Sequence, residues 1–284
     1  MKGRFAPSPT GVLHLGNLRT ALLAWLFARS AGSAFVVRVE DLDAGRVRPG
    51  LAQEQLDDLA AIGLDWDGPV WVQSERTAHY EGALASLPVY ECFCTRAEIR
   101  ESASAAHGPV GVYPGTCLGL SDAEREERRA AGRVPALRVR ADATVVHFED
   151  RLLGPQEGVV DDFVVRRNDG AFAYNLAVVV DDAAQGIEEV VRGADLADST
   201  PRQIWLARTL GYPEPAYAHV PLVLNAEGRR LAKRDGDVTL REVEAAEAVQ
   251  WMAGSLGLSG RTAAELLAGF DPRRIPREPT IWNG

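Results

Sequence analysis

A histidine and two glycines lie in a proline-rich segment near the N-terminus, PSPTGVLHLGN at residues 7–17. The segment follows a predicted strand and precedes a predicted helix, which is where open α/β sheets bind ligands. Free N–H groups at the start of the helix and the imidazole of His14 would suit the phosphates of a nucleotide. Gly11 and Gly16 would let the backbone approach such a ligand closely. The alternative is a turn in which His14 is only a hydrogen-bonded structural residue.

A second candidate is a basic loop that follows another predicted strand and the turn at residues 225–228. Four basic side chains lie within six positions of this loop, namely Arg229, Arg230, Lys233 and Arg234. Such a cluster would neutralise a departing pyrophosphate as charge builds up in a transition state. Only two of the 31 basic residues are lysines, Lys2 and Lys233, which favours chemistry specific to lysine at the second of them. The alternative is a solvated basic hairpin tip.

The three cysteines of the chain, Cys92, Cys94 and Cys117, fall within 26 positions of an irregular segment. Thiolates bind zinc tightly, and a small insert without its own core gains stability from a structural metal ion. A tetrahedral site needs a fourth ligand, for which His107 and Tyr113 are the candidates. Imidazole is the commoner ligand, so chemistry alone favours His107. The alternative is three reduced, buried cysteines without a metal.

The apolar pattern predicts strands that alternate with helices, and therefore a doubly wound, parallel α/β sheet. The predicted strands lie near residues 3–6, 35–39, 163–166, 187–191 and 219–224, and the predicted helices near residues 18–31, 51–62, 122–131, 240–256 and 262–269.

Two further local patterns make sharper predictions. Asn168-Asp169-Gly170 lies between apolar runs at residues 163–166 and 171–180 and predicts a hairpin. Thr200 is the predicted N-cap of a helix that has Pro201 in its first turn, Gln203 completing a capping box, and Gly211 at its end.

The chain divides into four segments by these criteria. We expect residues 1–90 and 135–240 to form two halves of one α/β catalytic domain, and residues 91–134 to form an insertion between them that carries the cysteines. Residues 241–284 form a short helical C-terminal segment. We expect one structural zinc ion per chain in the insertion.

Composition excludes several classes of protein. The 284 residues carry a net charge of −9, with 46% hydrophobic and 25% charged residues, as in an ordinary soluble globular protein. No apolar run is long enough to span a membrane, and the N-terminus has no secretory signal core. An odd number of cysteines argues for a reducing cytoplasm rather than a disulfide framework. The acidic balance argues against extensive, sequence-blind coating of nucleic acid.

The first two motifs together resemble the HIGH and KMSKS signatures of the class I aminoacyl-tRNA synthetases. Here the signatures read HLGN at residues 14–17 and RLAKR at residues 230–234. Three further strings narrow the resemblance to the glutamyl and glutaminyl branch, RFAPSPTG at 4–11, YNLAVVVDD at 174–182 and RGADL at 192–196. Asn17 replaces the last histidine of the first signature, and Ala232 replaces the serine of the second. The resemblance extends from residue 4 to about residue 240 and implies a Rossmann-type catalytic domain.

This resemblance implies roles for particular residues. It places L-glutamate against five side chains, and the positions are Arg4, Ser8, Glu40, Tyr174 and Arg192. It places ATP against His14, Gly16, Asn17 and Lys233, with His14 and Lys233 acting in catalysis and with Mg²⁺ on the phosphates.

Physical chemistry supports these glutamate assignments. Glu40 would pair with the α-ammonium group, and Arg4 and Arg192 offer bidentate forks for the carboxylates. An arginine also explains a preference for glutamate over glutamine, because a neutral amide would leave the guanidinium unpaired. The alternative for Glu40 and Arg192 is an internal structural ion pair.

The length favours one subset of this branch. Only about fifty residues follow Lys233, so we expect no large anticodon-binding domain, and this shortened architecture resembles the glutamyl-queuosine tRNA(Asp) synthetases. Members of that subset carry Cys-x-Cys followed by Tyr-x-x-x-Cys around zinc. By this resemblance Tyr113 is the fourth ligand, with His107 kept as the alternative.

The implied reaction has two steps. Glutamate is activated with ATP to glutamyl-adenylate and is then transferred to queuosine at the wobble position of tRNA(Asp), mainly by positioning and electrostatics. We expect a cytoplasmic ligase that binds no membrane and acts as a monomer on the queuosine-containing anticodon arm. Three alternatives remain, a truncated glutamyl-tRNA synthetase paralogue with another acceptor, a non-catalytic tRNA-binding paralogue, and a small-molecule nucleotidyltransferase.

Overall fold

The fold was analysed in a computed structural model, which describes residues 1–95, 97–99, 113–229, 231 and 238–282. A seven-stranded sheet forms its centre, with the order β3-β2-β1-β9-β10-β6-β7. The strands are parallel except for the antiparallel hairpin of β6 and β7 at one edge. Their bounds are β1 Gly3–Phe5, β2 Phe35–Val39, β3 Trp71–Val72, β6 Thr144–Asp150, β7 Gly154–Val160, β9 Glu189–Gly193 and β10 Ala216–Val220.

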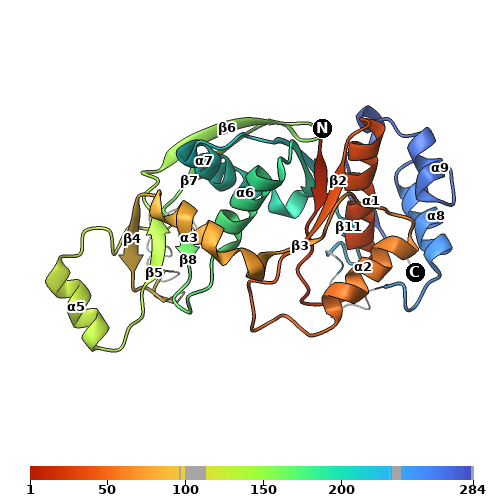
Figure 1. The fold of residues 1–284 in the computed structure, drawn as a ribbon. Helices are drawn as coiled ribbons and strands as arrows, with labels where there is room; N and C mark the ends of the chain where they lie inside the picture. The colour runs from red at the N-terminus through yellow and green to blue at the C-terminus, as the bar shows by residue number, and fades with distance from the viewer. Residues whose placement is uncertain (96, 100–112, 230, 232–237, 283–284) are drawn as a thin grey trace.

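Both faces of this sheet are covered, as the doubly wound prediction requires. Successive strand residues point to opposite faces, so Val37 and Val191 join one apolar core while Val36 and Val190 join the other. Helix α1 (Leu15–Ser30) covers the first face, and α3 (Thr77–Ala85), α6 (Tyr174–Gln185) and α7 (Thr200–Leu210) contribute to the core of the second. Helix α2 (Leu51–Ala61) lies beside α1 (Figure 1).

The C-terminal segment packs on the outer side of α1. Helices α8 (Ala245–Ser255) and α9 (Ala263–Ala268) add buried side chains to the same core as α1 and lie beyond it at one end of the molecule (Figure 1). Strand β12 (Thr280–Ile281) then pairs in parallel with β11 (Val223–Leu224). The end of the described chain therefore returns to the strand that precedes the basic loop.

A small antiparallel sheet, β4-β5-β8, lies at the opposite end, with α5 (Asp122–Ala130) furthest out (Figure 1). Its strands are β4 Val89–Cys92, β5 Ala136–Val139 and β8 Val164–Arg166. The sheet thus draws strands from both sides of the cysteine-bearing segment. Short 3₁₀ turns complete the described elements, η1 Gln73–Arg76, η2 Ala194–Ser199 and η3 Pro272–Arg274. Within the described ranges, no helix is both long and apolar enough to cross a membrane.

The structure corrects details of three local predictions. The predicted turn at 168–170 is present, with backbone bonds from Arg167 to Ala171 and from Ala173 to Val165 and a bridge between Arg166 and Phe172. The second strand of the hairpin ends there, however, because residues 174–180 belong to helix α6. The run of β-branched valines misled the prediction because α6 is buried, so it is apolar around most of its circumference. The helix predicted from about residue 18 is confirmed as α1, although it begins earlier, at Leu15. The predicted strand at 219–224 is two strands, β10 and β11, separated at Pro221.

Candidate functional site

A cavity of about 610 Å³ opens at the carboxyl ends of β1 and β9, beside the start of α1. This volume lies within the range of small-molecule sites. The cavity brings together eight of the residues predicted from the sequence, namely Arg4, Ser8, His14, Gly16, Asn17, Glu40, Tyr174 and Arg192. Lys233 and most of the basic loop lie outside the described residues.

His14 is the N-cap of helix α1. Its Nδ1 accepts a hydrogen bond from the Asn17 N–H at 3.2 Å, and the Asn17 Oδ1 accepts one from the His14 N–H at 3.3 Å. This is a capping box built from His and Asn rather than from the usual Ser and Glu. Because Nδ1 accepts, the neutral imidazole carries its proton on Nε2. His14 therefore has the structural role of the alternative interpretation, in which it is a hydrogen-bonded residue of the turn. It also lines the cavity, where its Nε2–H is a hydrogen-bond donor.

The expectation of free N–H groups at this helix start needs correction. The Leu15 N–H donates to the Val238 carbonyl at 2.9 Å, and the Asn17 N–H is held by His14. Two of the groups that would hold a phosphate are thus already bonded. Any anion bound here would depend more on side chains, such as His14, than on the helix terminus alone.

Gly16 and Gln55 fix the shape of this wall. A Cβ on Gly16 would lie 3.1 Å from two atoms of the His14 ring, so the glycine makes room for the imidazole. The amide nitrogen of Gln55, on α2, donates to the carbonyls of Ser8 and Gly11 at 3.1 and 2.6 Å. Gln55 is buried and was missed by the sequence analysis, because a glutamine on an amphipathic helix carries no motif.

Beneath the cavity lies a cluster of buried charges. Arg4 donates from Nε and Nη2 to both oxygens of Asp182, at 3.3 and 3.4 Å. Arg38, whose side chain is fully buried, donates to Asp182 at 2.8 Å and to Glu40 Oε1 at 3.1 Å. Asp181 lies 3.7 Å from the Nε of Arg38. Glu40 therefore does form the internal ion pair of the alternative interpretation, with Arg38, while its Oε2 has no partner among the described residues.

Two of the three carboxyls of this cluster have pKa values that shift in opposite directions. Burial raises the pKa of Glu40, against the attraction of Arg38 and Arg4. Burial also opposes ionisation of Asp182, but the charges of Arg4 and Arg38 outweigh it and lower its pKa. Asp182 is thus the fixed counter-ion of the two arginines. A further cation that enters the cavity would stabilise the ionised form of Glu40.

Arg192 is held by four hydrogen bonds to protein groups. Its Nη1 donates to the Tyr174 hydroxyl at 3.2 Å and to Gln203 at 2.8 Å, and its Nη2 donates to Thr200 at 2.8 Å. Its Nε donates to His219 Nε2 at 3.0 Å. These contacts use four of the five N–H groups of the guanidinium.

Two predictions change as a result. Arg192 does not present a free bidentate fork, because its described contacts leave a single N–H group, and Arg4 keeps only its Nη1 side clear of Asp182. Thr200 and Gln203 do not form a capping box either. The N-cap of α7 is Ser199, and the side chains of Thr200 and Gln203 hold Arg192 instead. Pro201 and Gly211 do lie at the start and the end of α7.

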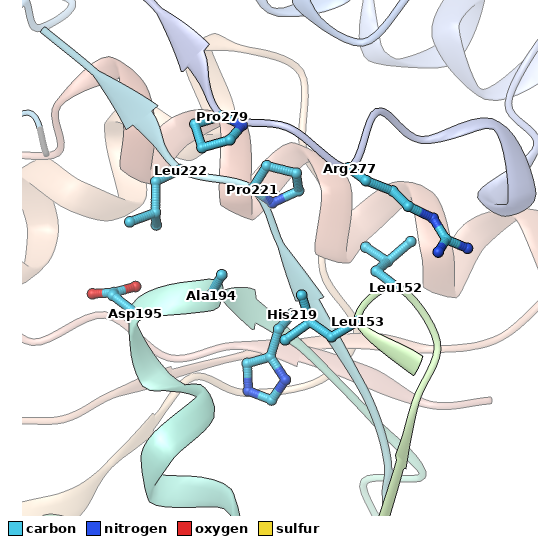
Figure 2. Close-up of a pocket in the computed structure, with 9 residues that line it drawn as sticks. All are labelled: Leu152, Leu153, Ala194, Asp195, His219, Pro221, Leu222, Arg277 and Pro279. Carbon is cyan, nitrogen blue, oxygen red and sulfur yellow. The ribbon is translucent and has the colours of Figure 1, made fainter. Parts of the chain in front are cut away.

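A smaller cavity, of about 280 Å³, adjoins the first and shares Asp195 and Leu222 with it. Figure 2 shows the imidazole of His219 on one side of this space, with Pro221, Leu222 and Pro279 on the other. The walls are mostly apolar. Neither this cavity nor the role of His219 could be predicted from the sequence, because the groups that surround the histidine come from segments far apart in the chain.

The three cysteines converge near the small sheet. Their Sγ atoms lie within 4.8 Å of one another, and those of Cys94 and Cys117 are 3.5 Å apart. The hydroxyl of Tyr113 lies 3.4 Å from the Cys92 Sγ and 3.8 Å from the Cys94 Sγ. A tetrahedral ion with Zn–S bonds of about 2.3 Å would hold sulfurs about 3.8 Å apart. The cluster therefore fits a metal ion of that size. His107 lies outside the described residues.

The pKa values of two thiols in this cluster shift in opposite directions. Burial raises the pKa of Cys94 to about 12, helped by its contacts with Cys117 and Cys92. Burial acts on Cys117 too, but hydrogen bonds from the Phe93 backbone and from Tyr113 outweigh it and lower the pKa of that thiol. Three thiolates so close together need a cation to coexist.

Hydrogen bonds fix the turn at the base of the basic loop. The Asn225 side chain accepts hydrogen bonds from the backbone N–H groups of Glu227 and Arg229, at 3.1 and 2.8 Å, which closes the predicted turn. Gly228 adopts a φ of +73°, as that turn requires. Leu231 is buried and lines the large cavity. The loop thus leaves the sheet at the wall of the site.

Comparison with known protein families matches residues 1–264 to the catalytic domain of class I tRNA synthetases (E and Q). The chain belongs to this family. The glutamyl-Q tRNA(Asp) synthetase of Nocardia farcinica is 62% identical over 98% of the chain and 92% of its own length. The enzyme of the same name from Symbiobacterium thermophilum is 49% identical over 98% of the chain and 94% of its own length.

A solved structure agrees with this membership. The glutamate tRNA ligase of Elizabethkingia meningosepticum, determined in complex with its amino acid, superposes with a TM-score of 0.83 at 26% identity. The superposition covers all of the chain and 67% of that ligase. The Rossmann-type prediction is thereby confirmed, and so is the resemblance to the glutamyl and glutaminyl branch of the class I synthetases.

Proposed function

We propose that the protein activates L-glutamate with ATP and transfers it to queuosine at the wobble position of tRNA(Asp). One observation carries this proposal, that a single cavity contains two kinds of binding group. Its walls include three side chains that suit carboxylates, those of Arg4, Tyr174 and Arg192, and also the histidine-capped start of α1. The names of the relatives from N. farcinica and S. thermophilum support the choice of acceptor.

The side chains suggest how glutamate would bind. One carboxylate accepts from the Nη1 side of Arg4, and the other from the Tyr174 hydroxyl and the remaining N–H group of Arg192. The ammonium group approaches Glu40 Oε2. Its positive charge stabilises the ionised carboxylate, which burial disfavours. Ser8 lines the same cavity and offers a further hydroxyl. Replacing glutamate by glutamine would leave an arginine without its anionic partner.

Activation follows from this placement. An oxygen of the glutamate α-carboxylate attacks the α-phosphorus of ATP, and the bond to the β-phosphate breaks, releasing pyrophosphate. The Nε2–H of His14 donates to the phosphates, next to Gly16 and Asn17, and Lys233 on the basic loop neutralises the departing pyrophosphate. We expect ATP to arrive with Mg²⁺, which supplies part of the charge neutralisation. A hydroxyl of queuosine then attacks the glutamyl carbonyl, loses its proton, and releases AMP.

Two assays test this proposal. Glutamate-dependent exchange of pyrophosphate into ATP, without tRNA, is expected, and its absence would refute the enzyme and leave a tRNA-binding paralogue. Exchange that does not depend on glutamate would favour a small-molecule nucleotidyltransferase. Radiolabelled glutamate is then offered to queuosine-containing tRNA(Asp), to the same tRNA without queuosine, and to tRNA(Glu). Label is expected only on the first, and label on tRNA(Glu) would refute the acceptor.

We also propose that Cys92, Cys94, Cys117 and Tyr113 hold one structural zinc ion. A zinc ion with three thiolates carries a net negative charge, and Arg128 lies 3.8 Å from the Cys117 Sγ, where it offsets that charge. Arg138 stacks 3.8 Å over the Tyr113 ring. Elemental analysis of the purified protein should find about one zinc per chain, and Cys117→Ser should lose it. Zinc retained by Tyr113→Phe but lost from His107→Ala would favour the alternative ligand.

We further propose that the protein acts in the cytoplasm as a monomer. Light scattering across a concentration series tests this proposal, and a mass that doubles with concentration would contradict it.

A further inference from the structure

We propose that Asp150 and His219 are positioning residues that hold Arg192 in the orientation needed to bind glutamate. This inference rests on the proposed function, because it concerns the arginine that we assign to a substrate carboxylate. It adds the turn between β6 and β7, far from the signature motifs, to the parts of the chain that shape the site.

Asp150 is the fixed end of this chain of contacts. Its side chain is fully buried, and its Oδ1 accepts from the backbone N–H groups of Leu152 and Leu153, both at 2.9 Å. The backbone N–H of His219 also donates to the carboxylate, at 3.2 Å to Oδ2. Four donors, including the His219 ring, thus converge on one carboxylate, which makes it a rigid anchor.

His219 connects Asp150 to Arg192 through its two ring nitrogens. Its Nδ1 lies 2.6 Å from Asp150 Oδ2, and its Nε2 lies 3.0 Å from the Nε of Arg192. The arginine can only donate, so Nε2 must accept, and the imidazole proton must be on Nδ1, where Asp150 receives it. Burial and the charge of Arg192 lower the pKa of His219, which keeps the ring neutral as this arrangement requires.

The geometry determines which N–H group of Arg192 faces the cavity. His219 holds Nε, while Thr200 and Gln203 on α7 and Tyr174 at the start of α6 hold the two terminal nitrogens. Without the contact to His219 the guanidinium would lose its one described hydrogen bond at Nε and could tilt about the Cδ–Nε bond, within the limits set by its three remaining contacts. Its remaining N–H group would then lose its direction toward the substrate, although the charge would stay.

Three variants separate this role from a general loss of packing. His219→Gln places an amide oxygen near the position of Nε2 and keeps an acceptor for Arg192. His219→Asn places an N–H group near the position of Nδ1, so it keeps the contact with Asp150 and loses the one with Arg192. Asp150→Asn retains shape but can donate to Nδ1, which drives the ring proton to Nε2, facing Arg192.

We expect His219→Asn and Asp150→Asn to raise the KM for glutamate in pyrophosphate exchange by roughly ten- to a hundred-fold, as for the loss of a hydrogen bond to a charged group. The KM for ATP should stay unchanged, and His219→Gln should recover most of the loss. Imidazole ¹⁵N chemical shifts should report Nδ1–H in the wild type and Nε2–H in Asp150→Asn.

The outcomes distinguish the two proposals. A wild-type protein without glutamate-dependent exchange would refute the proposed function. Wild-type exchange with an unchanged glutamate KM in His219→Asn, or an Nε2–H tautomer in the wild type, would refute only the positioning role. Equal increases in the KM values for glutamate and ATP, in step with a lower melting temperature in all three variants, would assign His219 a purely structural role.

Discussion

Arg38 is a fully buried cation that does not line the cavity, yet it orders the residues that do. It donates to Asp182, which holds Arg4, and to Glu40, which faces the cavity. An unpaired buried charge costs several kcal/mol, so each member of this cluster depends on the others. The positions of Arg4 and Glu40 in the cavity wall therefore depend on the buried charges of Arg38 and Asp182, which do not line the cavity.

Arg38→Met tests this dependence. The substitution keeps the apolar stem but leaves Asp181, Asp182 and Glu40 without their shared cation, so it should lower the free energy of unfolding by about 3–5 kcal/mol. Urea denaturation measures the change. Arg261→Met, at an exposed position, is the matched control and should stay within about 0.5 kcal/mol of the wild type. A loss as small for Arg38→Met as for the control would contradict the interpretation.

Tyr174→Phe tests the carboxylate-binding role of a half-exposed hydroxyl. The Tyr174 side chain accepts from Arg192, so its own proton remains to be donated to a ligand, and the residue is 39% exposed. Its loss should raise the KM for glutamate about ten-fold and change the melting temperature little. Tyr212→Phe, which lies away from the cavity, should leave the KM unchanged. The assignment fails if both variants bind glutamate equally well.

At the scale of elements, the start of α1 combines a structural task with a chemical one. His14 caps the helix through Nδ1 and so directs its Nε2 proton elsewhere. Gly16 leaves space for the ring at 3.1 Å. A helix terminus that uses a histidine as its cap thereby becomes part of a binding site.

Gly16→Ala should displace the His14 ring and raise the KM for ATP several-fold. Gly82→Ala is the matched control, because a Cβ there, within helix α3, would meet no atom within 4 Å. That control should stabilise the protein by about 0.5–1 kcal/mol, since alanine favours a helix over glycine. ATP titrations and thermal melts of both variants decide the matter. An ATP affinity for Gly16→Ala equal to that of the control would contradict the packing argument.

The turn after β6 should give stability a distinct dependence on pH. Burial opposes ionisation of Asp150, but hydrogen bonds from His219, Leu153 and Leu152 outweigh it and lower its pKa. A lowered folded pKa contributes stability above the unfolded value of about 3.9 and loses it as pH falls through the folded pKa. The free energy of unfolding of Asp150→Asn should therefore approach that of the wild type as pH falls below about 4. A constant difference between the two proteins from neutral to acid pH would refute this.

At the scale of the whole molecule, the C-terminal segment is attached to the catalytic core at several points. Arg19 on α1 is fully buried and donates to Ser255 on α8 and to the carbonyl of Pro221, at 2.8 Å each. The backbone N–H of Thr280 donates to the Leu222 carbonyl at 3.0 Å, and Trp282 donates to Leu224 at 2.8 Å. The segment therefore supports β11, from which the basic loop departs.

Thr280→Pro should weaken this support. Proline removes the N–H group that bonds to Leu222, so we expect β12 to detach and the rate of pyrophosphate exchange to fall more than the affinity for glutamate. Thr280→Val keeps the backbone donor and should behave as the wild type. Hydrogen exchange of residues near 222–224 would report the detachment directly. Unchanged exchange protection in the proline variant would show that the pairing contributes nothing.

Much of the fold follows from local pattern. The strands near residues 3–6 and 35–39 and helix α2 were predicted because apolar periodicity, glycine stops and caps are properties of neighbouring residues. Local pattern failed where burial overrides it. Helix α6 contains a run of valines that favours a strand, and only its packing between α3, α7 and the sheet makes it a helix.

The family, eight of the cavity-lining residues and the grouping of the three cysteines could all be predicted from the sequence, because short motifs record the chemistry that needs them. How those residues are held depends on contacts that exist only in the folded chain. Arg38, Gln55 and His219 carry no motif, and they reach the site from distant elements because the parallel sheet brings its strand ends together. A hydrogen bond between residues 27 to 178 positions apart leaves no trace in local spacing.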